Sequence, residues 1–263
     1  MDTYKLDTYT LKSGSSITIA KDYGCNMLSW KVDGKEILYH PNAFPGDLDS
    51  FYKGGNPVLF PSVGRTWDTS TGQAVAGIYK VFGKKETFNM PTHGILTLTE
   101  WNFVDAVESD NSISISYSLH TPEIVQEMAY PYSLELKITY ILTDCSIEIK
   151  SSITNTSKSP APYAFGLHPY FALSGTDRNG IKMVLPTQTQ VLLDSELLVP
   201  NGKTATTESE FDLEQGKDYD CVYGELTGKR ATLVDTGAGH KIHVDFDENI
   251  ENLVIYAGDG LPF

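Results

Sequence analysis

The sequence predicts an all-β protein, a large sandwich or barrel, and three observations support this fold class. Apolar and polar residues alternate over several segments, which is typical of strands with one buried face. Turn-forming residues recur roughly every 8 to 15 positions. No segment keeps a helical periodicity for more than about two turns. We therefore expect one β domain over residues 1–263.

The N-terminal segments predict two hairpins. Thr8–Ala20 contains a turn at residues 13–15, with alternating apolar residues after it. Residues Met27–Val32 and Glu36–Tyr39 flank Asp33-Gly34. Aspartate and glycine tolerate positive φ, so this pair predicts a tight hairpin turn.

The next segments are less regular. Pro41–Gly55 is rich in proline, glycine, asparagine and aspartate, and we expect a long surface loop of a kind that is often functional. Leu96–Thr99 and Trp101–Val104 alternate and predict strands. Glu123–Met128 and Ser195–Leu198 are the only modest helix candidates.

The middle of the chain gives the clearest alternation, with isoleucine, leucine and tyrosine on one face and serine, threonine and charged residues on the other. Period-two alternation predicts an antiparallel sheet with one face exposed to water or to a cleft. Shorter apolar alternations predict further strands towards the C-terminus. The predicted strands are centred on residues 113–119, 134–142, 147–151, 183–185, 233, 242–246 and 254–256.

Composition narrows the functional classes. The formal net charge of −14 and the lack of a basic stripe argue against a nucleic-acid partner and make a highly anionic substrate less favourable. The apolar runs are far shorter than the roughly 18 residues of a membrane span. The first residues show no signal peptide. The cysteines are odd in number and match no zinc pattern, which favours free thiols and a cytoplasmic location; they are Cys25, Cys145 and Cys221.

Four polar residues stand out because glycine, proline or aromatic residues surround them: Arg65, His93, His168 and Asp220. Pro169 favours an extended backbone at His168, and an imidazole so held can donate a proton near neutral pH. A purely structural role is also open for these residues. His168 could be a core histidine, Arg65 could form a surface salt bridge, and Asp220 could cap the end of a strand. The remaining histidines, which we expect to be solvated or structural, are His40, His120, His240 and His243.

The order and spacing of these motifs resemble the aldose 1-epimerase (galactose mutarotase-like) family over roughly residues 15–263. The matching pieces are Asn56-Pro57-Val58-Leu59-Phe60-Pro61 with Gly64-Arg65, Met90-Pro91-Thr92-His93-Gly94 with Trp101, Asn155, Phe165-Gly166-Leu167-His168-Pro169-Tyr170-Phe171, and Tyr219-Asp220.

The resemblance implies a β-supersandwich, a large, twisted, mostly antiparallel sandwich with a sugar cleft. It also implies an isomerase that interconverts the α and β anomers of a free aldohexose by general acid and base catalysis. No metal or cofactor is implied. By analogy His168 is the acid, His93 binds near the ring oxygen, and Arg65 and Asp220 hold sugar hydroxyls. Trp67 is a candidate to stack on the sugar, with core packing equally open.

The chain departs from the family pattern in two places. The general base of the family is a glutamate expected just after Phe263, so the last strand or strands of the family are expected to be missing from residues 1–263; Glu248 and Glu251 are poor substitutes. Many relatives also carry an arginine shortly after the His-Gly pair, where this chain has residues 95–97, Ile-Leu-Thr. This second departure leaves sugar specificity open.

Other functions stay open at this level. A hexose-6-phosphate 1-epimerase needs a cationic pocket, for which Lys80, Lys84 and Lys85 are the candidates. A non-catalytic sugar-binding protein on the same scaffold is favoured if the glutamate is absent. A lyase or hydrolase usually requires paired carboxylates, and no convincing pair is present. The sequence does not define the oligomeric state.

Overall fold

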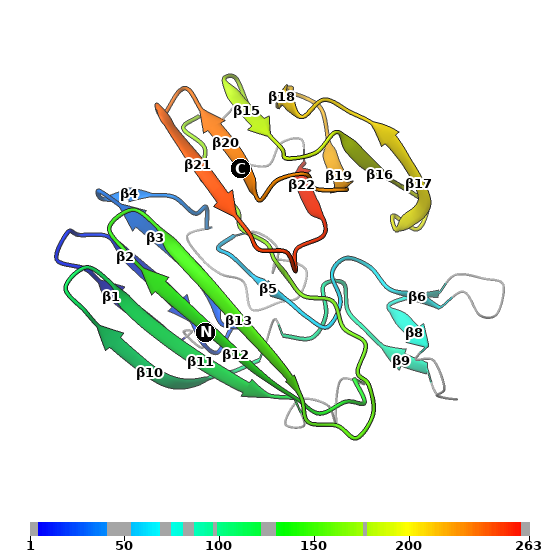
Figure 1. The fold of residues 1–263 in the computed structure, drawn as a ribbon, viewed down its shortest axis with the longest axis horizontal. Helices are drawn as coiled ribbons and strands as arrows, with labels where there is room; N and C mark the ends of the chain where they lie inside the picture. The colour runs from blue at the N-terminus through cyan, green and yellow to red at the C-terminus, as the bar shows by residue number, and fades with distance from the viewer. Residues whose placement is uncertain are drawn as a thin grey trace. The chain divides into compact units, whose positions relative to one another are not determined.

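The computed structural model describes residues 5–40, 54–68, 75–80, 87–96, 99–121, 130–175 and 178–258, and every regular element in these ranges is a β-strand. The all-β prediction is confirmed. The chain divides into two compact units, Met1–Phe171 and Ala172–Phe263 (Figure 1). Strands β1 to β14 belong to the first unit and strands β15 to β22 to the second. The described residues include no helix with the length and apolar character needed to cross a bilayer.

Two four-stranded antiparallel sheets form the main part of the first unit, and each follows the chain order of its strands. One contains β1 (Leu6–Thr10), β2 (Ser16–Ala20), β3 (Asn26–Val32) and β4 (Lys35–Glu36). The other contains β10 (Asn102–Glu108), β11 (Ile113–His120), β12 (Leu134–Leu142) and β13 (Ile147–Asn155).

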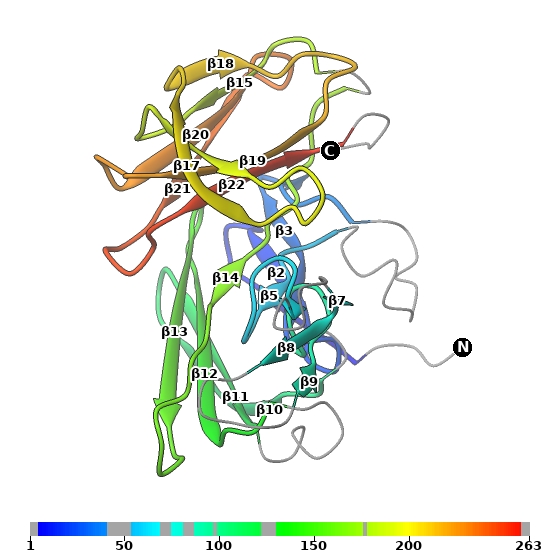
Figure 2. The same ribbon diagram turned by 90° about the vertical axis from the view of Figure 1, so that its right-hand side faces the viewer.

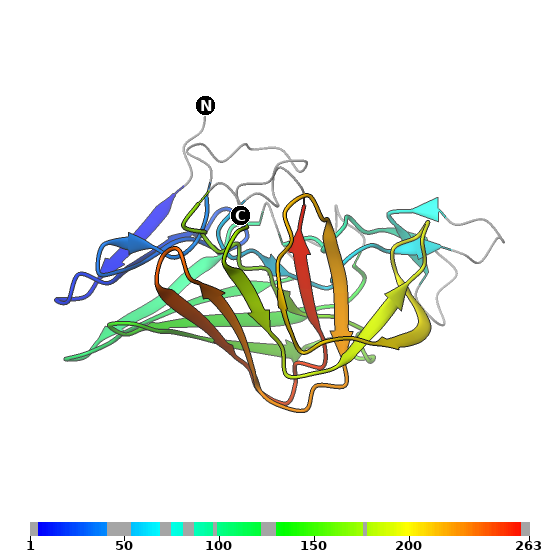
Figure 3. The same cartoon turned by 90° about the horizontal axis from the view of Figure 1, so that it is seen from above.

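One hydrophobic core joins these two sheets, which lie as two layers in Figures 1 and 3. Strand β12 shows why the sequence alternates, since every second side chain from Leu134 to Leu142 is buried. Ile17 and Ile19 of β2 are fully buried in the same cluster. Burial of a full side chain of this size contributes about 1.5–3 kcal/mol, so the alternation fixes which face of each strand turns inward.

Polar groups also connect the two layers. The Tyr140 hydroxyl donates to the Cys25 carbonyl at 2.8 Å, and the Tyr117 hydroxyl donates to the Asp7 carboxylate at 2.9 Å. A buried phenol needs such an acceptor, because an unpaired buried hydroxyl loses its bonds to water. Burial raises the pKa of the Cys25 thiol well above its ordinary value, so Cys25 is a packed residue and no reactive thiolate.

Three two-stranded sheets complete the first unit (Figure 2). They pair β5 (Val58–Leu59) with β14 (Gly166–Leu167), β6 (Trp67–Asp68) with β7 (Val75–Ala76), and β8 (Ile78–Lys80) with β9 (Thr87–Asn89).

The second unit consists of two further four-stranded antiparallel sheets, with strand orders β18-β15-β20-β21 and β17-β16-β19-β22. Phe211 contacts Tyr219 and Tyr223 across the two sheets, with ring centroids 6.2 and 6.3 Å apart. The strands are β15 (Ile181–Val184), β16 (Thr189–Leu193), β17 (Pro200–Thr206), β18 (Glu210–Asp212), β19 (Tyr219–Gly224), β20 (Arg230–Asp235), β21 (His240–Asp245) and β22 (Leu253–Ala257).

The hairpin predictions are confirmed in their turns. Asp33 and Gly34 have φ values of 50° and 75°, as a tight hairpin turn requires. The predicted strand Glu36–Tyr39 is wrong in its extent, because β4 ends at Glu36. Leu38 bridges Phe171 and the Tyr39 amide donates to the Tyr170 carbonyl, so this segment leaves β3 for a distant partner.

Four local predictions have other outcomes. The predicted strand Leu96–Thr99 lies partly outside the described residues; of its ends, the Thr99 amide donates to the Leu96 carbonyl at 3.0 Å. Ser195–Leu198 forms a turn, because the Asp194 carboxylate accepts the amides of residues 196 and 197. The helix candidate Glu123–Met128 and most of the predicted loop Pro41–Gly55 lie outside the described residues.

Candidate active site

Two segments far apart in the sequence form the base of the site. Beyond the short β5–β14 pairing, the His168 amide donates to the Pro57 carbonyl at 3.0 Å, and the Tyr170 amide donates to the Gly55 carbonyl at 2.9 Å. The Ala164 amide donates to the Pro61 carbonyl at 2.8 Å. These hydrogen bonds alternate along the two segments and continue the antiparallel pairing on both sides of β14. They hold the backbone at His168 in an extended conformation.

The turn that contains His93 is hydrogen-bonded to the first of these two segments. The Ile95 amide donates to the Phe60 carbonyl at 2.9 Å, and the His93 amide donates to the Gly64 carbonyl at 2.8 Å. His93 has φ of 65° and Gly94 has φ of 90°. A non-glycine residue in the left-handed region is uncommon and is tolerated where surrounding contacts hold it. The bonds to residues 60 and 64 supply those contacts.

The two histidines that the sequence singled out come together. The ring centroids of His93 and His168 are 5.5 Å apart, with the ring planes 82° to one another. The His168 ring also stacks on Tyr170 at 4.7 Å. Both histidines are half-buried, while Arg65, immediately after Gly64, is exposed and within electrostatic reach of His93. The structure therefore places three of the four predicted site residues in one region of the first unit.

A backbone hydrogen bond selects the tautomer of His93. The Gly64 N–H donates to His93 Nδ1 at 2.9 Å. A ring nitrogen that accepts a hydrogen bond carries no proton, so the proton of the neutral ring is on Nε2. Burial, followed by the positive charges of His168 and Arg65, lowers the pKa of His93 from 6.5 to about 4. At neutral pH His93 is therefore an uncharged hydrogen-bond donor.

The low pKa of His93 has a measurable effect on stability. Between about pH 4 and pH 6.5 the unfolded chain binds more protons at this residue than the folded chain. The stabilising contribution is thus complete above pH 6.5 and is lost as the pH falls towards 4. We expect the wild-type protein to lose on the order of 2 kcal/mol more than His93→Gln between pH 7 and pH 4.5.

Urea unfolding of the two proteins at both pH values measures this difference. Titration of the His93 ring by NMR is the direct check, with a midpoint near pH 4 as the expected result. A midpoint near the ordinary value of 6.5 and equal acid sensitivity of the two proteins would contradict the assignment.

Asp220 belongs to the second unit. It is the second residue of β19, its side chain is exposed, and it stands opposite Tyr256 of β22 in the antiparallel register. Directly opposed residues point to the same face of a sheet. Tyr256 is 46% exposed, which is unusual for a large aromatic residue, so this face presents a carboxylate beside an aromatic ring.

Sequence reasoning missed several features of these surfaces. Tyr256 was expected only as a strand residue, although it is the aromatic member of an otherwise aliphatic alternation. The stacking of Tyr170 on His168 was not expected either, although the two-residue spacing is the signal for side chains on the same face of an extended segment. The Gly64 N–H could not be identified, because a backbone donor leaves no mark in a sequence.

The other predicted candidates are placed as follows. Trp67 is half-buried in β6, and Glu248 and Glu251 are exposed residues just after β21. His120 and His243 pair with hydroxyl groups, of Ser133 at 3.2 Å and of Thr232 at 3.0 Å. The side chain of Lys80, and all of Lys84 and Lys85, lie outside the described residues.

Comparison with known proteins decides the family. A protein-family model for aldose 1-epimerase matches residues 7–262, almost the whole chain and both compact units. The chain belongs to the aldose 1-epimerase family.

Solved structures of similar fold agree with this membership. The Slr1438 protein of Synechocystis sp. PCC 6803 is 23% identical, with a TM-score of 0.81 over 97% of this chain and 82% of that one. A galactose mutarotase-like protein from Clostridium acetobutylicum is 16% identical, with a TM-score of 0.76 over 98% and 85%. Galactose 1-epimerase from Lactobacillus acidophilus is 16% identical, with a TM-score of 0.64 over 88% and 77%.

These comparisons confirm the galactose mutarotase-like fold expected from the sequence. Family membership and fold together support a sugar epimerase or mutarotase role, with a small-molecule sugar as substrate. In the described ranges no group of three or more His, Cys, Asp or Glu side chains is arranged to hold a metal ion.

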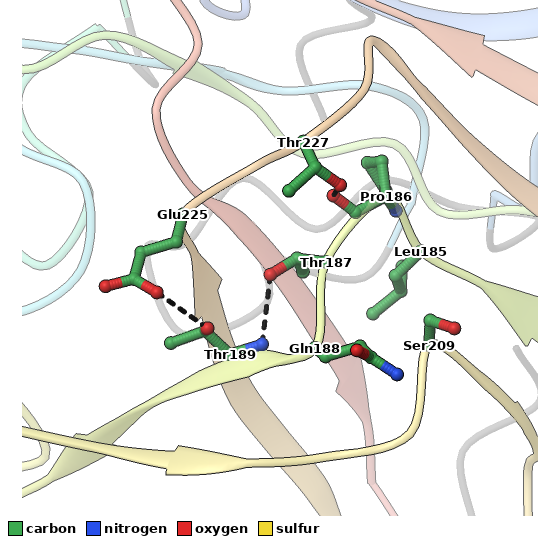
Figure 4. A pocket seen from close by; sticks show the side chains of 8 residues that line it. All are labelled: Leu185, Pro186, Thr187, Gln188, Thr189, Ser209, Glu225 and Thr227. Atoms are coloured by element: carbon green, nitrogen blue, oxygen red, sulfur yellow. Dashed lines mark hydrogen bonds between the residues drawn. The ribbon is translucent and has the colours of Figure 1, made fainter.

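A groove of about 460 Å³ lies in the second unit of this epimerase-family chain (Figure 4). Three of its polar side chains are hydrogen-bonded within the fold: Thr189 Oγ1 donates to Glu225 at 2.8 Å, and the Thr189 amide donates to Thr187 Oγ1 at 3.0 Å. None of the four predicted site residues lines it. The lining residues are Leu185, Pro186, Thr187, Gln188, Thr189, Ser209, Glu225 and Thr227.

Proposed function

We propose that this protein interconverts the α and β anomers of a free aldohexose by general acid and base catalysis. The observation that carries the proposal is the pairing of His93 and His168, with ring centroids 5.5 Å apart. One ring is held neutral as a donor by the Gly64 amide. Family membership supports the same chemistry.

The different roles of His93 and His168 follow from the protonation of their two rings. An imidazole that already accepts the Gly64 N–H and has a pKa of about 4 is a poor proton carrier at neutral pH. Two imidazoles this close do not both hold an extra proton readily, because like charges repel. We therefore assign the acid to His168 and hydrogen bonding near the ring oxygen to His93.

The reaction needs only proton transfers. His168 gives its proton to the ring oxygen as the bond between that oxygen and the anomeric carbon breaks, and the electron pair of the bond stays on the oxygen. A base removes the proton of the anomeric hydroxyl, whose O–H electron pair becomes the π bond of the aldehyde. The aldehyde end then turns, and ring closure on its other face returns both protons.

The resemblance to the family assigns sugar binding to two further residues. Arg65 and Asp220 hold sugar hydroxyls, because a guanidinium offers several donors and a carboxylate offers acceptors. The resemblance to the family assigns the role of base to a glutamate. Tyr256 adds an apolar face beside Asp220 on which a sugar ring can pack.

Polarimetry of freshly dissolved α-D-glucose and α-D-galactose tests the proposal. We expect the full chain to accelerate the approach to the equilibrium rotation, and a parallel assay with glucose 6-phosphate separates the phosphate-specific alternative. No acceleration with any of these sugars would reject the proposed function. Sugar binding by calorimetry without acceleration would instead indicate a non-catalytic sugar-binding protein.

A further inference from the structure

Arg178 is a charged residue in the interior of the second unit. It is only 5% exposed, although arginine is among the residues that are almost never fully buried unless paired. No carboxylate in the described ranges forms an ion pair with it. Its position, just before β15, lies outside every motif that the sequence indicated as functional.

Backbone carbonyls supply the partners of its guanidinium. One terminal nitrogen donates to the Lys217 carbonyl at 2.5 Å and to the Glu214 carbonyl at 3.4 Å. The other terminal nitrogen donates to the Gly258 carbonyl. The guanidinium also lies 6.0 Å from the centre of the Tyr219 ring, within the range of a cation–π contact.

These carbonyls belong to the same end of one strand pair. Residues 214–217 lead directly into β19, and Gly258 directly follows β22. Strands β19 and β22 are antiparallel neighbours, with Tyr219 opposite Ala257 and Asp220 opposite Tyr256. The planar guanidinium fork thus bonds to the chain entering one strand and to the chain leaving the other. A lysine ammonium lacks this fixed fork geometry.

A buried charge without a carboxylate partner destabilises a fold unless strong hydrogen bonds compensate for its loss of water. Arg230 of the same unit shows the more usual arrangement, an exposed arginine paired with a carboxylate. Arg230 is exposed and forms a bidentate pair with Asp245 at 2.6 and 2.8 Å, so its charge keeps both a carboxylate partner and contact with water. Arg178 instead fixes main-chain positions next to Asp220 and Tyr256.

We propose that Arg178 is a positioning residue that clamps the end of the β19–β22 pair and so sets the placement of Asp220 and Tyr256 for sugar binding. This inference rests on the proposed function for its link to sugar. The effect of Arg178 on the backbone at the end of the β19–β22 pair can be tested without any sugar.

Hydrogen exchange measured by mass spectrometry tests the clamp. The variant Arg178→Met keeps most of the side-chain length and removes the charge and the donors, and Arg178→Lys keeps the charge and removes the fork. We expect exchange on the order of tenfold faster in peptides covering residues 214–224 and 250–258 of Arg178→Met, with no change over 230–245. Arg178→Lys should lie between this variant and the wild type.

Arg230→Met is the matched control, because it removes an exposed arginine and its ion pair from the same unit. It should leave exchange over 214–224 and 250–258 unchanged. Uniformly faster exchange through the unit, global unfolding of Arg178→Lys, or no change in Arg178→Met would each overturn the clamp.

Kinetics test the link to sugar. Loosening of two binding residues should raise KM about tenfold in Arg178→Met while kcat changes by less than about threefold, since neither Asp220 nor Tyr256 transfers a proton in the proposed reaction. Equal losses in kcat and KM, or an unchanged KM beside faster local exchange, would overturn the positioning role. If the wild type accelerates no sugar, the proposed function fails, and the exchange data still decide the clamp.

Discussion

Replacing His168 with glutamine is expected to reduce kcat for mutarotation about 100- to 10,000-fold, the usual contribution of a positioned general acid. The amide keeps a polar group in place but cannot carry a proton at neutral pH. His93 cannot take over, because its Nδ1 accepts the Gly64 amide and its pKa is about 4. Polarimetry with α-D-galactose or α-D-glucose measures the loss.

A suitable control for this variant is His243→Gln. His243 lies on β21 in the second unit, is exposed, and contacts the Thr232 hydroxyl at 3.0 Å. Its replacement should leave kcat within about twofold of the wild-type value, as is normal for a surface residue away from a site. Comparable rates for His168→Gln and the wild type would remove His168 from the role of acid.

Gly94→Ala is expected to destabilise the first unit by about 3 kcal/mol or more, since it combines a steric clash with backbone strain. A Cβ atom at this position would lie 2.0 Å from the Phe60 carbonyl oxygen. That oxygen already accepts the Ile95 amide, so the backbone that supports His93 must shift to make room. Urea unfolding followed by tyrosine and tryptophan fluorescence measures the change in stability.

The control separates the clash from the strain. Gly14 has φ of 94°, close to the 90° of Gly94, but a Cβ atom there meets nothing within 4 Å. Gly14→Ala should therefore lose only about 1 kcal/mol, the part due to the left-handed backbone. Equal losses in the two variants would show that the contact of residue 94 with Phe60 has no energetic role.

Much of the local structure was predictable from sequence because its cause is local. Alternation from Leu134 to Leu142 reports a strand with one buried face, and the structure buries every second residue there. Asp33-Gly34 predicts its turn because few other residues adopt two successive positive φ values. The prediction failed at Glu36–Tyr39, because Leu38 and Tyr39 pair with Phe171 and Tyr170 instead of extending β4.

The sequence by itself determined the all-β class, the family resemblance and the identity of His93 and His168 as unusual histidines, because these depend on residue types and their order. Only the tertiary structure decided that the two rings meet, that the Gly64 amide fixes the tautomer of His93, and that Arg178 bonds to the chain beside β19 and β22. These features depend on backbone N–H and C=O groups brought together over long distances. Such groups are alike in nearly every residue, so the sequence carries no mark of which of them will meet.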